Sequence, residues 1–169
     1  EWLAIDNTRS ALVIRPTVIF GPNNRGNVYN LFRQIFSGRF LMIGSGTNQK
    51  SMSYVKNVVS FIQDRIDKDF HGFELFNYSD KPDFSMNLLV SEIYAFKDKK
   101  VPFLKIPYSL GIFIGYIFDL LASIVRKKLP ISSIRVKKFC ASSTINADKV
   151  KESGFVPPYS LQQAIAHTL

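Results

Sequence analysis

Short apolar runs alternate with segments of helical periodicity in the first part of the chain. Residues 11–14 are continuously apolar and rich in β-branched side chains, which predicts a strand buried on both faces, as in a parallel sheet. Pro16 ends this strand because proline cannot donate to a strand ladder. Apolar side chains then recur at helical spacing over residues 28–37, and Gly38 is expected to terminate that helix.

The middle of the chain repeats this alternation. Residues 40–43, 50–54 and 73–78 favour strands. A helix is expected to begin near Val55, because apolar side chains recur there with a period close to 3.6. One face of this helix is expected to carry Val58, Val59, Ile62 and Ile66.

Helices are predicted to dominate the last part of the chain. Ser85 is the expected N-cap of a helix that runs through Phe96. Strands alternating with helices, followed by a helical and proline-punctuated region, indicate an α/β architecture with a smaller attached lobe. Further helices are expected at about residues 107–127, 132–140, 146–153 and 160–168.

The composition of the chain excludes only a few kinds of site. The chain has 169 residues, 46% of them apolar, which suits a folded domain with a real core. Cys140 is the single cysteine, so no internal disulfide can form. The two histidines, His71 and His167, lie far apart in the sequence, so we expect no metal site.

A formal net charge of +9 favours anionic partners, namely nucleic acid, a membrane surface or a phosphorylated ligand. No nucleic-acid motif accompanies the charge, so we expect no nucleic-acid partner. Residues 106–125 are largely apolar, but Asp119 lies inside them and would oppose insertion as a spanning helix. A buried or partly exposed helix is the favoured interpretation, and a membrane-surface helix ended by Arg126, Lys127 and Lys128 is the minority one.

Four short segments carry recognisable patterns. Residues 15–23 read as a strand ending in Arg-Pro, followed by a Phe-Gly-Pro turn. Residues 44–59 combine a Gly-Ser-Gly turn with a basic residue and a Tyr-Val pair, and residues 76–78 are Phe-Asn-Tyr. Residues 146–157 close the series with Asn-Ala-Asp-Lys-Val and Ser-Gly-Phe-Val-Pro. In order and spacing, these segments resemble the NAD-dependent epimerase/dehydratase family of extended short-chain dehydrogenases, and within it the nucleotide-sugar 4-epimerases.

This resemblance implies that residues 1–169 are the C-terminal portion of such a protein. They would supply the last strands of a Rossmann-type α/β fold together with a smaller, mostly helical substrate-binding lobe. The N-terminal, cofactor-binding part would be missing. The first residues, 1–5, read as the end of a helix already under way. In the family, the parent enzyme acts on a nucleotide sugar by transient hydride transfer to NAD or NADP, and the resemblance implies a cytoplasmic protein and leaves a homodimer open.

Six residues correspond to ligand-binding positions of the family. The backbone of Pro16, Thr17 and Val18 would face the nicotinamide. Lys50 stands where the family has an arginine that contacts the diphosphate, so it keeps the charge but not the bidentate geometry. The alternatives are a solvated loop lysine for Lys50 and a helix N-cap for Asn27. The implied substrate-binding residues are Asn27, Lys50 and Arg135.

The chain lacks the family's catalytic pattern. None of the seven tyrosines is followed four positions later by lysine, and no glycine-rich dinucleotide fingerprint is present. The resemblance therefore places the Tyr-x-x-x-Lys pair upstream of Glu1 and implies that this chain alone is inactive. Two other interpretations stay open. One is a hydroxysteroid-type or reductase-type member of the same superfamily, suggested by the apolar 106–125 segment, and the other is a non-catalytic basic binding module, suggested by charge alone.

Overall fold

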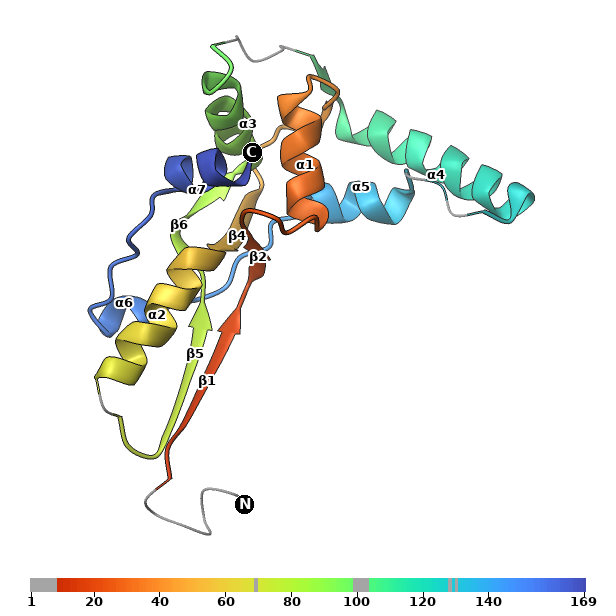
Figure 1. Ribbon diagram of the computed structural model, residues 1–169. Coiled ribbons are helices and arrows are strands. Elements are labelled where there is room, and N and C mark those ends of the chain that lie inside the picture. The colour runs from red at the N-terminus through yellow and green to blue at the C-terminus, as the bar shows by residue number, and fades with distance from the viewer. Residues whose placement is uncertain (1–8, 69, 99–103, 128, 130) are drawn as a thin grey trace. The chain divides into compact units, whose positions relative to one another are not determined.

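A computed structural model describes residues 9–68, 70–98, 104–127, 129 and 131–169 (Figure 1). The expected helix end at residues 1–5 and the basic Lys128 lie outside the described residues. The chain divides into two compact units. The first is built from described residues of 9–33, 51–83 and 144–169, and the second from those of 34–50 and 84–143.

Parallel strands form the framework of the first unit. Strand β1 (Ala11–Pro16) pairs in parallel with β5 (Phe73–Tyr78) over six residues. A second sheet has the order β2 (Val18–Phe20), β4 (Gln49–Tyr54) and β6 (Asp80–Ser85), and β2 runs parallel to β4. The predicted strands at 11–14, 50–54 and 73–78 are therefore confirmed, while β6 was not predicted.

Aromatic rings from three parts of the chain make the core of this unit. Phe61 of helix α2 (Val55–Asp67) contacts Phe76, Tyr78 and Phe155, with ring centroids 5.1–5.2 Å apart. Helix α6 (Asp148–Glu152) adds Val150 to the same cluster. Helix α7 (Leu161–Thr168) begins at Ser160 with a complete capping box. The last segment of the chain thus completes the core that β5 and α2 begin.

One prediction about burial is wrong. The apolar residues of β1 are only half-buried, because among the described strands β1 pairs with β5 alone and only Leu12 and Ile14 pack on the core cluster. Helix α2 begins at Val55 as predicted, and its buried residues are Asn57, Val58 and Phe61. Of the four apolar side chains expected on one face, Val58 is buried, whereas the other three are exposed: Val59, Ile62 and Ile66.

Helix α1 (Asn27–Phe36) follows the predicted pattern. Val28, Phe32 and Ile35 are buried, and Phe32 meets Phe20 edge to face at 5.5 Å. Gly38, two residues beyond the helix, has φ = 72°, a conformation that favours glycine, and its N–H bonds to the carbonyl of Ile35.

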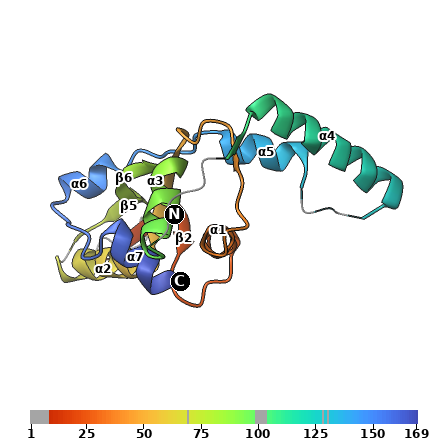
Figure 2. The same ribbon diagram turned by 90° about the horizontal axis from the view of Figure 1, so that it is seen from above.

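The second unit is mostly helical, in agreement with the expected smaller lobe. Helix α3 (Met86–Ala95) is capped by the Ser85 side chain, as predicted. Helices α4 (Tyr108–Val125) and α5 (Ser133–Cys140) lie side by side (Figures 1 and 2). A small parallel pair of strands, β3 (Met42–Ile43) and β7 (Lys105–Ile106), completes the unit.

Two glycines allow α4 to lie close to its neighbours. A Cβ at Gly115 would come within 2.7 Å of the backbone of Ser133, and one at Gly111 within 2.5 Å of the Ile43 side chain. The carboxylate of Asp119 accepts a hydrogen bond from the Ser133 N–H at 3.1 Å. The face of α4 that carries these residues is therefore fixed against α5.

Candidate functional site

Lys50 is held at the C-terminal end of α5. Its Nζ donates to the carbonyls of Lys138 at 3.0 Å and of Ala141 at 2.6 Å. Carbonyls in the last turn of a helix have no partner within the helix, and the helix dipole favours a cation at this end. Partial burial lowers the pKa of Lys50, and its interaction with Cys140 opposes that shift. In this structure Lys50 is a capping cation rather than a loosely solvated side chain.

Neighbouring residues reinforce this junction. The Asn48 amide donates to the carbonyl of Phe139 at 2.8 Å. The Gln49 N–H donates to the Ser142 hydroxyl at 3.1 Å, and the Ser143 N–H donates to the Gln49 carbonyl at 2.8 Å. The turn before β4 is thus joined to the end of α5 through groups about ninety positions apart in the sequence.

A cavity of about 290 Å³ lies beside this junction, within the second unit. Its polar groups are hydroxyls, an amide and one ammonium group. The Lys137 Nζ donates to the Tyr116 hydroxyl at 3.2 Å, and this bond raises the pKa of Lys137, so the ammonium stays charged at neutral pH. One cation with several hydrogen-bonding groups suits an anionic ligand. The lining residues are Ile43, Gly44, Ser45, Asn48, Tyr108, Lys137, Cys140 and Ala141.

The structure brings two of the predicted substrate residues to the same helix. Lys50 binds the end of α5, and Arg135 lies on α5 two residues before the cavity-lining Lys137. The backbone N–H of Arg135 donates to Ser132, the N-cap of that helix. Asn27 belongs to the first unit, where it is exposed and is the first residue of α1.

The predicted cofactor-facing stretch links β1 to β2. The Thr17 N–H donates to the carbonyl of Tyr78 at 3.0 Å, and its hydroxyl shares a 2.7 Å hydrogen bond with that of Ser53. Pro16 has no N–H and is exposed, as is the Val18 side chain. What this stretch offers a ligand is therefore the apolar surface of Pro16 and Val18, at the carboxyl end of a parallel strand.

A buried polar network in the first unit was not foreseen from the sequence. The Asp80 carboxylate accepts hydrogen bonds from the Tyr54 N–H at 2.7 Å, the Tyr78 hydroxyl at 2.9 Å and the Asn57 amide at 3.1 Å. Burial raises the pKa of Asp80 despite these bonds, and burial together with Asp80 raises the pKa of Tyr78 far above its usual range. These bonds join Asp80 of β6 to the ends of β4 and β5 and to α2, so the network holds these elements together.

Asn57 uses both ends of its side-chain amide in this network. Its amide nitrogen donates to Asp80 and to the Tyr159 carbonyl, while its amide oxygen accepts from the Tyr159 N–H at 3.0 Å. Only an amide can both donate and accept in this way. An aspartate at this position would place a second carboxylate against Asp80.

Within the described residues, no group of three or more His, Cys, Asp or Glu side chains could hold a metal ion.

No family model matches the chain, but the chain is similar over nearly its whole length to several curated enzymes. The chain is 53% identical, over its whole length, to N-acetyl-alpha-D-glucosaminyl-diphospho-ditrans,octacis-undecaprenol 4-epimerase of Escherichia coli O157:H7, of which it covers 51%. It is 28% identical to UDP-glucose 4-epimerase of Vibrio cholerae, with 98% of the chain and 48% of that protein aligned. It is 32% identical to sterol-4-alpha-carboxylate 3-dehydrogenase (decarboxylating) of Candida albicans, with 98% of the chain and 51% of that protein aligned.

Solved structures support the same fold. The UDP-glucuronic acid 4-epimerase of Bacillus cereus in complex with NAD superposes with a TM-score of 0.60 at 14% identity, covering 93% of this chain and 42% of that one. The chain spans about half the length of the curated relatives it matches. The four motifs, the two units and these similarities agree: the chain has the α/β fold of these epimerases and is similar in sequence to about half of each curated relative.

Proposed function

We propose that this chain is the substrate-side part of an NAD(P)-dependent 4-epimerase that acts on a hexose linked through a diphosphate. The observation that carries the proposal is 53% identity to a 4-epimerase along the entire chain. Because the chain spans about half of that relative, the activity is proposed for the full-length polypeptide and not for these residues alone.

The cavity at the end of α5 supports a role in binding the diphosphate. Lys50 and Lys137 bring two ammonium groups to this helix, and Arg135 adds a guanidinium on its surface. Charge-assisted hydrogen bonds to phosphate oxygens are the strong interactions that such groups make. In the proposed complex, a diphosphate oxygen takes the ammonium of Lys50 in place of a helix carbonyl. Asn27, in the first unit, stays a substrate-binding residue that only the family resemblance predicts.

The cofactor surface is proposed at Pro16, Thr17 and Val18. Their place at the carboxyl end of β1 fits the position that ligands take in open parallel sheets, and the exposed Val18 side chain offers an apolar contact for a ring. NAD or NADP, when bound, accepts a hydride from the sugar and returns it. Tyrosine with lysine four positions later is absent here, so the proton-transferring pair is assigned to the part of the polypeptide that this chain does not include.

Two substrates share the proposed chemistry. A nucleoside diphosphate hexose is the substrate that the family resemblance implies. An N-acetylhexosamine carried on a polyprenyl diphosphate is favoured by the higher identity to the undecaprenol-linked epimerase, 53% against 28% for the UDP-glucose epimerase. The shared diphosphate would occupy the Lys50 site in both cases. A cytoplasmic location and a homodimer stay predictions.

The test is to express the full-length polypeptide and supply each substrate with NAD, following the appearance of the C4 epimer by chromatography. Lys50→Met should lower kcat/KM about 10- to 100-fold through KM, since it removes one charged hydrogen bond of about 1.5–3 kcal/mol. Lys50→Arg should restore most of the loss. Ser142→Ala is the matched control, because it removes a bond to the Gln49 N–H at the same helix junction without removing charge or a residue that lines the cavity. Absence of a C4 epimer from both substrates would reject the proposal.

The alternative within the superfamily is a sterol-type dehydrogenase. Its supporting observation is the 32% identity to the sterol dehydrogenase. Oxidation of a 3-hydroxysterol by the same preparation, with no epimerisation of either sugar substrate, would establish this alternative.

A further inference from the structure

Helix α4 presents an outward apolar stripe that is one helix face wide. Its residues follow the spacing 3, 4, 3, 4, which keeps them on one side of a helix. Each is between 43% and 69% exposed. At 1.5 Å per residue the stripe is about 20 Å long. It consists of Leu110, Phe113, Ile117, Leu120 and Ile124.

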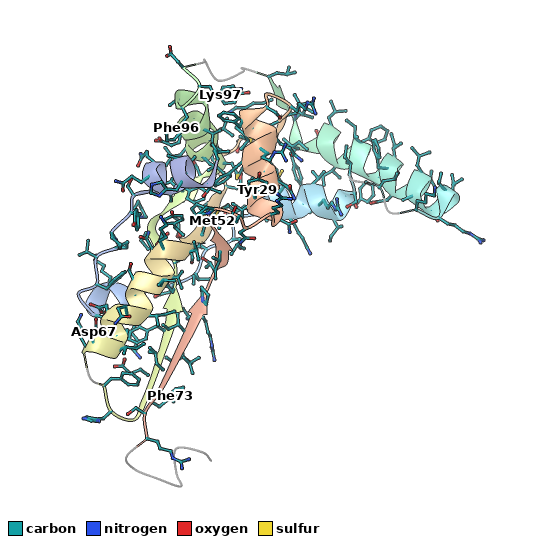
Figure 3. All side chains as sticks on the ribbon, in the orientation of Figure 1. Tyr29, Met52, Asp67, Phe73, Phe96 and Lys97 are labelled. Atoms are coloured by element: carbon teal, nitrogen blue, oxygen red, sulfur yellow. The ribbon has the colours of Figure 1, made fainter. Side chains whose placement is uncertain are left out.

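The stripe carries no charge, because the single acidic residue of α4 points elsewhere. Asp119 accepts a hydrogen bond from the Ser133 N–H at the start of α5. Gly111 and Gly115 lie on the same inner face and touch Ile43 and Ser133. Among the described helices, α4 alone is long and apolar enough to cross a membrane, with only 11% of its 18 residues buried. Figure 3 shows its side chains projecting from the helix along its length.

Basic residues border the stripe. Arg126 and Lys127 follow directly after α4 and are exposed. On the neighbouring α5, Lys137 and Lys138 are also exposed, and Lys137 reaches Tyr116 of α4. An uncharged apolar face flanked by lysine and arginine is the arrangement that binds at the interface of anionic lipids.

We propose that α4 is a monotopic membrane anchor, with its outward stripe in the acyl-chain boundary of an anionic bilayer and the adjacent basic residues at the headgroups. The helix lies along the surface and does not cross the bilayer. Its inner face is occupied by α5, and a spanning orientation would draw Lys137 and Lys138 toward the hydrocarbon. The sequence favoured a buried or partly exposed helix over a membrane-surface helix. The exposure of the apolar stripe now favours the membrane-surface helix.

Membrane binding by α4 does not depend on epimerase activity, because it rests on the exposed apolar surface of α4 and on the adjacent basic residues. If the substrate is carried on a polyprenyl diphosphate, the anchor holds the site where such a lipid resides. Two other occupants would cover the same stripe. They are the remainder of the polypeptide and a second copy of the chain.

The experiment is flotation of the full-length protein with vesicles, without substrate. Vesicles of phosphatidylethanolamine and phosphatidylglycerol should carry the protein upward, and vesicles of phosphatidylcholine should carry much less of it. The double variant Phe113→Glu with Leu120→Glu should reduce the bound fraction at least tenfold. Val156→Glu, at an apolar position that is 80% exposed in the first unit, is the matched control and should float like the wild type.

A second variant keeps the test valid if the double glutamate variant does not fold. Leu120→Trp preserves the apolar surface, and its fluorescence should be quenched by lipids brominated on the acyl chains. Failure of the wild type to float, or an unquenched Trp at position 120, would overturn the proposal. A dimer on gel filtration that the glutamates dissociate, with no vesicle binding, would overturn it in favour of an interface between copies.

Discussion

Apolar and acidic side chains differ in burial between the two units of this chain. In the first unit, aromatic side chains of α2 and β5 close on one another, and even polar Asp80 is buried with three hydrogen-bond partners. In the second unit, α4 keeps its large apolar side chains outside and places its small residues and its single acid inside. Apolar character alone therefore does not decide burial, because the close approach of α5 selects glycine for the inner face of α4.

The sharpest test of this contrast compares two phenylalanines. Phe61→Ala should lower the free energy of unfolding by about 3–5 kcal/mol, because it opens a cavity among Phe76, Tyr78 and Phe155. Phe113→Ala should change it by less than about 0.5 kcal/mol, because this side chain is 60% exposed. Urea denaturation of the full-length variants measures both. Equal losses would show that another surface covers α4 in solution.

The buried network of the first unit predicts a strong effect of a small change. Asn57→Asp should destabilise the protein by about 2–4 kcal/mol, since it sets a second carboxylate against Asp80 and loses the donor to the Tyr159 carbonyl. The loss should shrink below about pH 5, where one of the two carboxyls takes up a proton. Thermal unfolding at pH 4.5 and pH 7.5 measures this difference. Asn27→Asp, at an exposed position, is the control and should be near neutral.

The smallest of these predicted effects concerns the stability of the protein at alkaline pH. The pKa of Tyr78 is raised in the folded state, so its contribution is present below the unfolded pKa of about 10 and is lost as pH rises above it. Each pH unit above 10 should remove up to about 1.4 kcal/mol through this one group. Tyr78→Phe, although less stable at pH 8, should show a shallower decline between pH 10 and pH 11 in urea denaturation. An unchanged slope would contradict the assignment.

Local signals predicted the helices well. Ser85 and Ser160 cap α3 and α7 through contacts that a few neighbouring residues determine. The buried face of α2 was not predictable in this way, because Val58 and Val59 are adjacent and equally apolar, and the choice between them depends on Phe76 and Phe155. Strand β6 escaped prediction because its sequence, Asp-Lys-Pro-Asp-Phe-Ser, is polar and contains proline.

Local sequence signals also predicted the candidate site only in part. The sequence marked Lys50 and Arg135 through a family resemblance, and the structure brings Lys50 to the end of the helix that carries Arg135. The contact between Lys50 and Ala141 joins positions 91 apart, and no local pattern encodes such a distance. Lys137 and the cavity beside it were missed, since a lysine on a helix surface reads as ordinary solvation.

The interleaving of the two units sets an order of assembly during synthesis. The chain passes from one unit to the other after Arg33, Lys50, Asp83 and Ser143. A ribosome that adds about 5–20 residues per second therefore finishes the second unit while the first still lacks its final segment. That segment supplies Ala147, Val150, Ala164 and Ile165 to the core. The nascent protein thus displays its apolar α4 before its own first unit can close.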